Sequence, residues 1–378
     1  MNQIIYAGYG KYKKLKDILN KHNPKKIFVV TGKKSFELCG AKNLFKVVFN
    51  KYDTIKFNDF DPNPKIEDIK KGIKEFKKSK SDLIIGIGGG SVLDMAKSIS
   101  ILYTQEDDIE KIINNNSLTT KKKIPTIAIP TTAGSGAEST CFSVIYINKQ
   151  KFSLENDLLM PDYAILDPVF TESLPPYVAA CSGMDALCHA IESYWSVNST
   201  EESRKYSKKA LKIILNNIVN AVNNPDKISR KNMLLGSNLA GKAINIAKTT
   251  AAHSLSYPLT SYYNIPHGHA VALTLPYLMR LNCDVDSHNL QDNRGVMFVR
   301  KIMFNLFKIL NVDTYQKARD KFISTMKEIG LETRLLKLGI NKEGISIIVK
   351  NGFNPKRMIN NPRIISKDDL VQLLKNIL

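Results

Sequence analysis

Short apolar segments separated by helical stretches are the feature of this sequence that most restricts its fold. Residues 26–31 and 83–87 are runs of mostly β-branched and other apolar side chains, and the second run leads directly into three glycines at 88–90. Strands that are apolar on both faces belong to parallel sheets covered by helices. Between the two runs, residues 66–76 place apolar side chains at helical spacing. Two further strand candidates are residues 126–129 and 163–166.

These elements predict an α/β domain with a doubly wound parallel sheet, a fold class that binds dinucleotides. After about residue 172 long helical segments take over and few strand candidates remain. A chain of 378 residues is long enough for two packed domains. We therefore predict a dinucleotide-binding α/β domain over residues 1–172 and an all-α domain over residues 173–378. The clearest helical segments of the second domain are 204–222, 271–281 and 296–310.

Composition limits the class of protein. The net charge of +20 comes from 55 Lys+Arg against 35 Asp+Glu, but the excess is almost all lysine and has no interleaved aromatics for base stacking. We expect a solvated basic surface, with a nucleic-acid-binding protein as the alternative from another class. No apolar run approaches the roughly 20 residues of a membrane span, so we expect no membrane partner. The N-terminus has no secretory signal pattern and the five cysteines form no Cys-x-x-Cys pair, which indicates a cytoplasmic protein.

The glycine-rich turn after the strand at 83–87 is the first candidate binding element. Its glycines let a ligand approach bare backbone, and the helix that follows offers free N–H groups to phosphate. Ser91 and Asp94 also fit a capping box, which is a purely structural feature. By itself the segment is compatible with pyrophosphate binding or with a tight structural turn. We assign its cofactor role to Gly88, Gly89, Gly90, Ser91 and Asp94.

Two other loops follow strand candidates of the same sheet. The loop at 130–138 carries the hydroxyl groups of Thr131, Thr132 and Ser135, which suits a dinucleotide at this sheet edge, although an ordinary polar loop has the same composition. The turn from Gly32 to Ser35 has no acidic residue to repel a 2′-phosphate. It therefore predicts that NADPH is accepted alongside NADH, unless its lysines only belong to the general lysine excess.

Four of the six histidines fall in two short regions of the predicted helical domain. Asp185 and His189 are four residues apart, on one helix face, where a local hydrogen bond is the simpler explanation. His253 lies in an almost uncharged stretch and needs a partner if it is buried. With His267, these residues make one carboxylate and three imidazoles, a plausible site for Fe(II) or Zn(II). The remaining residue of the group is His269.

Four motifs occur in order along nearly the whole chain and resemble the iron-containing (group III) alcohol dehydrogenase family. They are Gly-Gly-Gly-Ser-x-x-Asp-x-x-Lys at 88–97, Pro-Thr-Thr-Ala-Gly-Ser-Gly-x-Glu at 130–138, Gly-Met-Asp-Ala-Leu-x-His-Ala-Ile-Glu at 183–192 and Pro-His-Gly at 266–268. The resemblance implies a dehydroquinate synthase-like fold, a homodimer, and NAD(P)H-linked reduction of an aldehyde to a primary alcohol. It also implies a metal, Fe2+ before Zn2+, held in the domain cleft by Asp185, His189, His253 and His267, with Lys151 near the cofactor ribose.

The stretch at 248–261 and the Asn-Asn-Pro-Arg at 360–363 resemble the phosphonoacetaldehyde reductase branch of that family. Many members carry a further histidine where this chain has Tyr257. The resemblance implies reduction of phosphonoacetaldehyde to 2-hydroxyethylphosphonate. The alternative substrate within the family is a short aliphatic aldehyde, as in butanol dehydrogenases.

An anionic substrate next to a metal needs cations and hydroxyl donors. We predict that Lys248, Thr249 and Tyr257 contact the anionic group, with Arg363 as a second cation. Against this, Lys248 could extend to solvent and Arg363 could only anchor the C-terminal helix. The candidate proton donors are Tyr257 and His269.

Overall fold

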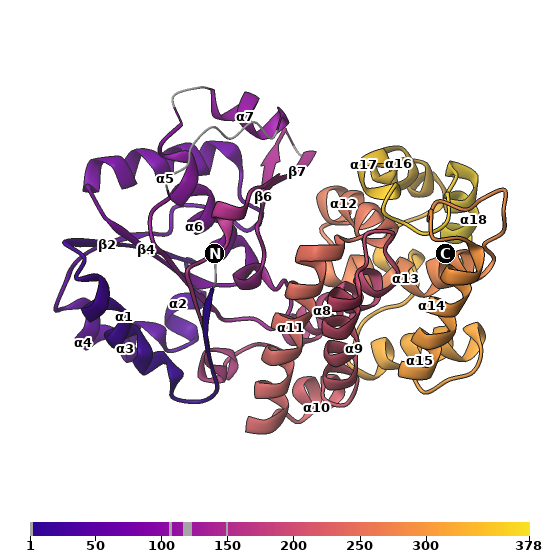
Figure 1. Cartoon of the computed structure of the whole chain (residues 1–378), viewed down its shortest axis with the longest axis horizontal. Helices are drawn as coiled ribbons and strands as arrows, with labels where there is room; N and C mark the ends of the chain where they lie inside the picture. Colours follow the sequence, from indigo (N-terminus) through magenta and orange to yellow (C-terminus); the bar gives the residue numbers. More distant parts are fainter. Residues whose placement is uncertain (1–2, 106–107, 116–122, 149) are drawn as a thin grey trace. The chain divides into compact units, whose positions relative to one another are not determined.

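The computed structural model describes residues 3–105, 108–115, 123–148 and 150–378 (Figure 1). These residues form two compact units, Met1–Leu174 and Pro175–Leu378. The division falls two residues after the boundary expected from the sequence, just before a helix that begins with Pro176.

A six-stranded parallel sheet lies at the centre of the first unit, in the order β1-β8-β5-β4-β2-β3. The fold class is the predicted one. The two strands that the sequence pattern did not reveal are β1 and β3, which lie at the sheet edges and are only partly buried. Charged residues interrupt the apolar side chains of β3, whereas β1 is apolar throughout but only four residues long. The strands are β1 (Ile4–Ala7), β2 (Lys26–Thr31), β3 (Asp53–Phe57), β4 (Leu83–Gly88), β5 (Thr126–Pro130) and β8 (Tyr163–Leu166).

Helices cover both faces of this sheet because successive strand residues point to opposite sides. Phe28 and Val30 pack with α5 (Ile66–Ser79), α6 (Gly90–Leu102) and α7 (Ile109–Asn115). Ile27 and Val29 pack on the other face. Figure 1 shows α5 and α6 on one side of β2 and β4, and the α1–α4 helices on the other. These are α1 (Lys14–His22), α2 (Ser35–Leu38), α3 (Ala41–Leu44) and α4 (Lys46–Phe49).

An antiparallel hairpin that the sequence pattern did not predict packs against α6. It consists of β6 (Phe142–Ile147) and β7 (Gln150–Glu155). Its buried side chains Ile145 and Leu154 join the same apolar cluster as α6. The short 3-10 helices of the chain are η1 (Lys11–Lys13), η2 (Ala137–Ser139), η3 (Asp157–Leu159), η4 (Pro168–Thr171) and η5 (Leu336–Leu338).

The second unit is helical, and no strand occurs between residues 175 and 378. Its buried helix α8 (Pro176–Trp195) contacts α9 (Glu201–Leu215), α11 (Lys227–Ala247) and α13 (His267–Cys283) (Figure 1). The remaining helices are α10 (Ile218–Asn223), α12 (Ala251–Tyr263), α14 (Val296–Ile309), α15 (Tyr315–Glu328), α16 (Lys342–Gly352), α17 (Pro355–Met358) and α18 (Lys367–Ile377).

The single helix predicted over residues 204–222 is wrong, because the chain breaks into α9 and α10 at Asn216 and Asn217. The Asn217 side chain donates a hydrogen bond to the Ile213 carbonyl (2.7 Å). Asparagine commonly competes with helical hydrogen bonds in this way. Among the described helices, none is long and apolar enough to cross a bilayer.

Candidate functional site

The glycine turn joins β4 to α6, and close packing requires two of its glycines, Gly88 and Gly90. None of them is among the positive-φ residues of the described chain. A Cβ on Gly88 would lie 2.5 Å from the Val92 side chain, and one on Gly90 would lie 2.8 Å from the Ser135 hydroxyl. The turn therefore presents bare backbone at the start of a buried helix, as expected for a phosphate-binding turn.

The capping box predicted for Ser91 and Asp94 is wrong, because α6 begins two residues earlier, with Gly89 at the N-cap. The Ser91 hydroxyl accepts a hydrogen bond from the Asn63 amide (3.1 Å). Asp94 is buried and pairs with Lys97 (3.3 Å), which also donates to the Ala137 carbonyl (2.9 Å). Burial raises the pKa of Asp94 and lowers the pKa of Lys97. This pair ties the 130–138 loop to α6.

The other predicted cofactor residues lie at the carboxyl ends of neighbouring strands. The Thr131 amide donates to the Gly88 carbonyl (3.0 Å), so the loop after β5 lies against the turn after β4. Gly32 follows β2, the other neighbour of β4, and a Cβ there would meet the Ser35 hydroxyl. Thr132 faces Gly89, while Lys151 is half-buried on β7. Loops at the carboxyl ends of parallel strands are where doubly wound sheets bind dinucleotides.

An acidic residue that local sequence reasoning missed also lies near the turn after β2. Asp61, from the loop that precedes α5, forms an ion pair with Lys33 (2.8 Å). Both side chains are exposed. The turn itself has no carboxylate, but the fold brings one to it.

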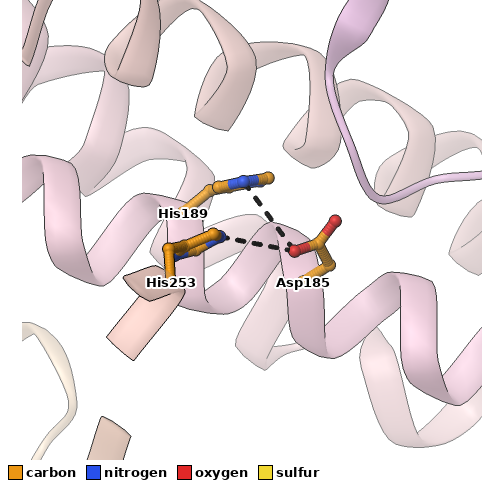
Figure 2. A group of neighbouring side chains, drawn as sticks. All are labelled: Asp185, His189 and His253. Carbon is orange, nitrogen blue, oxygen red and sulfur yellow. Dashed lines mark ion pairs between the residues drawn. The ribbon is translucent and has the colours of Figure 1, made fainter. Parts of the chain in front are cut away.

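Asp185, His189, His253 and His267 converge in the helical unit. Asp185 and His189 lie on successive turns of α8, His253 is near the start of α12, and His267 is the first residue of α13. The Nε2 atoms of His189, His253 and His267 lie 3.8, 3.6 and 3.9 Å from Asp185 Oδ1. Figure 2 shows the first two imidazoles facing that oxygen. Their rings are stacked, with centroids 4.5 Å apart.

This cluster has the properties of a metal site. The ligand atoms of Asp185, His189 and His253 lie within 4.8 Å of one another, and all three residues are buried. Asp185 Oδ1 and His253 Nε2 have no hydrogen-bond partner in the described structure. Burying such atoms is costly unless something else satisfies them. A divalent cation between these atoms would do so, and a carboxylate with imidazoles suits Fe(II) or Zn(II). The residues therefore fit the metal that the sequence predicted.

The carboxylates and imidazoles of the cluster stabilise one another's charged forms. Burial acts to raise the pKa of Asp185, but the imidazoles of His189, His267 and His253 outweigh it and hold that pKa below its ordinary value. Burial acts to lower the pKa of His253, but Glu192 and Asp185 raise it to about 9. The site therefore keeps its carboxylate ionised, which a metal ligand requires.

Gly268 explains why Pro-His-Gly precedes α13. A Cβ at this position would overlap the Cys181 carbonyl and would lie 2.8 Å from Asp185 Cβ. Only a glycine therefore allows the start of α13 to approach α8 this closely. The approach places His267 beside Asp185.

Two residues that sequence reasoning missed contact the Nδ1 atoms of His253 and His267. Glu192 is fully buried and hydrogen-bonds to His253 Nδ1. The Ser256 hydroxyl lies 3.2 Å from His267 Nδ1. Glu192 belongs to the 183–192 motif, on the same helix as two of the ligands, and this position was the available signal.

Lys248 and Thr249 connect α11 to the helix that carries His253. Thr249 is buried, and its hydroxyl accepts a hydrogen bond from Arg357 of α17 (3.3 Å). Within the described structure Arg357 forms no ion pair with a carboxylate. The predicted second cation, Arg363, lies elsewhere, paired with Asp369 of α18 (3.3 Å). The structure thus brings Arg357, rather than Arg363, to Thr249.

The backbone of Lys248 has φ 64° and ψ 171°, a region that almost only glycine occupies, at a cost of about 1–3 kcal/mol. Glycine carries an entropic penalty of roughly 0.5–1 kcal/mol. We expect Lys248→Gly to raise the thermal midpoint of the helical unit by about 2–4 °C, the shift of a gain near 1 kcal/mol. Calorimetry of the purified protein checks this, and a lower midpoint would show that Lys248 contacts outweigh the strain.

The two candidate proton donors differ in their surroundings. His269 is buried, with Nε2 at the Glu332 carbonyl (2.7 Å) and Nδ1 at the Tyr177 hydroxyl (3.3 Å). Both ring nitrogens are therefore engaged, which argues against His269 as the donor. Tyr257 is half-buried, four residues after His253 on α12.

Two family models match this chain. "Iron-containing alcohol dehydrogenase" matches residues 2–168, and "Fe-containing alcohol dehydrogenase family, C-terminal" matches residues 179–378. The long-chain-alcohol dehydrogenase 1 of Geobacillus thermodenitrificans is 30% identical, over 94% of this chain and 90% of that protein. The lactaldehyde reductase of Escherichia coli K12 is also 30% identical, over 99% of this chain and 97% of that protein. The crystal structure of sulfoacetaldehyde reductase from Bifidobacterium kashiwanohense in complex with NAD+ has a TM-score of 0.87 and 30% identity, over 99% of this chain and 96% of that chain.

Proposed function

The chain belongs to the iron-containing alcohol dehydrogenase family of alcohol and aldehyde oxidoreductases, and we propose that it reduces phosphonoacetaldehyde to 2-hydroxyethylphosphonate with NADH or NADPH and a bound Fe2+. The observation that carries this proposal is the placement of Lys248 and Thr249 immediately before the helix of His253, with Arg357 bonded to Thr249. A cation and a hydroxyl donor thus stand a few residues from the metal cluster.

The four-residue cluster would hold the metal. When bound, a divalent metal supplies Lewis acidity that polarises an aldehyde carbonyl, and the reduced nicotinamide supplies the hydride. Asp185 contributes the negative charge of the ligand set, and the imidazoles contribute neutral donors. Tyr257 is the candidate group for delivering the proton to the alkoxide. The hydroxyl- and glycine-rich loops after β2, β4 and β5 would hold the dinucleotide.

The anionic group of the substrate is the finer part of the proposal. A phosphonate oxygen is bound best by charge-assisted hydrogen bonds. Lys248 and Arg357 offer two cations of different geometry, and Thr249 offers a hydroxyl. The similarity to a sulfoacetaldehyde reductase supports this choice, because a sulfonate and a phosphonate are both tetrahedral anions on a two-carbon aldehyde.

A panel of aldehydes tests the proposal. The purified, iron-loaded enzyme is given phosphonoacetaldehyde, sulfoacetaldehyde, lactaldehyde or butyraldehyde, and the loss of reduced-nicotinamide absorbance is followed. We expect the highest kcat/KM with phosphonoacetaldehyde. If butyraldehyde is the best substrate and phosphonoacetaldehyde is not reduced, the enzyme is a butanol-type dehydrogenase instead. Loading with Zn2+ in parallel decides between the two metals.

Cofactor choice gives a further prediction. The exposed carboxylate of Asp61 neutralises Lys33 and would repel a 2′-phosphate near the turn after β2. We expect Asp61→Ala to raise the ratio of kcat/KM for NADPH to that for NADH several-fold. Asp17→Ala is the matched control, because Asp17 forms a similarly exposed ion pair with Lys14 on α1. An unchanged ratio in Asp61→Ala would place the ribose away from Lys33.

A further inference from the structure

Glu192 is a buried carboxylate whose oxygens are both engaged around one metal ligand. Its Oε2 hydrogen-bonds to His253 Nδ1, and its Oε1 accepts from the Thr250 hydroxyl (2.7 Å) and the Ala252 amide (2.8 Å). The Thr250 hydroxyl in turn accepts a hydrogen bond from Trp195 Nε1 (3.0 Å). Glu192, Thr250 and Trp195 are fully or almost fully buried. The end of α8 and the start of α12 thus hold this carboxylate at one position.

The geometry determines which nitrogen of His253 can bind a metal. An ionised carboxylate only accepts hydrogen bonds, so Nδ1 of His253 must carry the proton that faces Glu192. In the neutral imidazole that binds a metal, the lone pair then lies on Nε2, the atom that faces Asp185 Oδ1 at 3.6 Å. Nε2 is also a buried atom without a hydrogen-bond partner in the described structure. Glu192 therefore aims the free donor of His253 at the centre of the cluster.

His267 also has a hydrogen-bond partner at Nδ1, but this partner is a neutral hydroxyl and not a carboxylate. His267 Nδ1 meets the neutral Ser256 hydroxyl at 3.2 Å, and the His267 side chain is 30% exposed, compared with 4% for His253. A carboxylate partner raises the basicity of an imidazole more than a hydroxyl does. We therefore expect His253 to be held more firmly than His267 and to be the stronger donor to a metal.

We propose that Glu192 is a positioning residue that fixes His253 in its metal-binding tautomer and orientation and thereby sets how tightly the site holds its divalent metal. This inference rests on the proposed metal-dependent function. Glu192 does not touch substrate, cofactor or the reacting atoms, and it acts only through His253.

The test is metal retention rather than activity. Glu192→Gln keeps the shape of the side chain and removes its charge. We expect it to weaken metal binding by about 10- to 100-fold, measured as competition for the metal by a chelator, first with Fe2+ and then with Co2+. In the Co2+ protein the ligand-field absorption bands should also shift, because the donor strength of His253 changes. Glu201→Gln is the matched control, since Glu201 is an exposed glutamate paired with Lys205 on α9.

Three comparisons make the result decisive. Ser256→Ala should weaken metal binding less than Glu192→Gln does. If Glu192→Gln does not fold, Thr250→Val provides the second variant, because it removes the hydroxyl that donates to Glu192 while keeping the carboxylate. We expect Thr250→Val also to weaken metal binding, and Thr250→Ser to retain it. Unchanged chelator competition and spectra in the folded variants would overturn the inference, even if the variants are thermally less stable.

The outcome also separates this inference from the function on which it rests. If the parent protein binds neither Fe2+ nor Co2+, the metal site and the role of Glu192 are both wrong. If the parent binds metal and reduces aldehydes while Glu192→Gln retains metal equally well, only the role of Glu192 is wrong.

Discussion

Replacing His253 by alanine is expected to remove the bound metal and to lower kcat/KM for aldehyde reduction by a factor on the order of a thousand or more. A metal that acts as a Lewis acid supplies several kcal/mol of transition-state stabilisation, and each 1.4 kcal/mol or so is a factor of ten in rate. His253 is the most deeply buried of the three imidazoles and lies 3.6 Å from the Asp185 oxygen that all of them face. Elemental analysis and steady-state kinetics on the same preparation measure both effects.

The same substitution also has a structural cost, which the sequence alone did not indicate. Without His253, Glu192 and Asp185 remain buried beside a cavity, and leaving a buried carboxylate without its hydrogen-bond partner costs about 1–3 kcal/mol or more. His267→Ala is the cleaner variant because that side chain is partly exposed. We expect it to lose metal and turnover with a smaller change in thermal midpoint. Stoichiometric metal and normal turnover in His253→Ala would show that the cluster is not the metal site.

The resemblance to the family, rather than local spacing, implied that the four metal ligands converge, and only part of their arrangement is visible in local sequence. The i, i+4 spacing of Asp185 and His189 already places two ligands on one helix face. The motif around His267 contains a glycine, Gly268, which the close approach of α13 to α8 requires. These positions depend on local structure and so leave a signal in the sequence.

Contacts between distant segments left no comparable signal. Glu192 meets His253 only because the start of α12 comes to α8, and the two residues are 61 positions apart in the chain. Arg357 and Arg363 both lie near the C-terminus, but α17 brings Arg357 to Thr249, whereas Arg363 lies in an isolated bridge with Leu290. The edge strand β3 was missed for a different reason, since an edge strand need not be apolar on both faces and β3 contains two charged residues.

The second large effect is expected from Lys248, the residue that we propose binds the anionic group of the substrate. Lys248→Met removes the charge and keeps an apolar stem of similar length at the same strained backbone position. Losing a charge-assisted hydrogen bond costs about 1.5–3 kcal/mol, so we expect kcat/KM for phosphonoacetaldehyde to fall about 10- to 150-fold. Butyraldehyde has no anionic group, and its kcat/KM should change little. The ratio of the two values, measured with saturating reduced cofactor, is the quantity to compare.

Two further variants identify what Lys248 contributes. Lys248→Gly also lacks the charge but relieves the backbone strain, so it should show the same loss for phosphonoacetaldehyde as Lys248→Met and a higher thermal midpoint. Arg357→Met should also lower kcat/KM for phosphonoacetaldehyde and leave that for butyraldehyde unchanged, because the Arg357 guanidinium reaches Thr249, the neighbour of Lys248. If Lys248→Met and Lys248→Gly lower kcat/KM equally for both aldehydes, Lys248 acts by positioning His253 and not by binding the anionic group of the substrate. In that case a general aldehyde reductase is the better description of the enzyme.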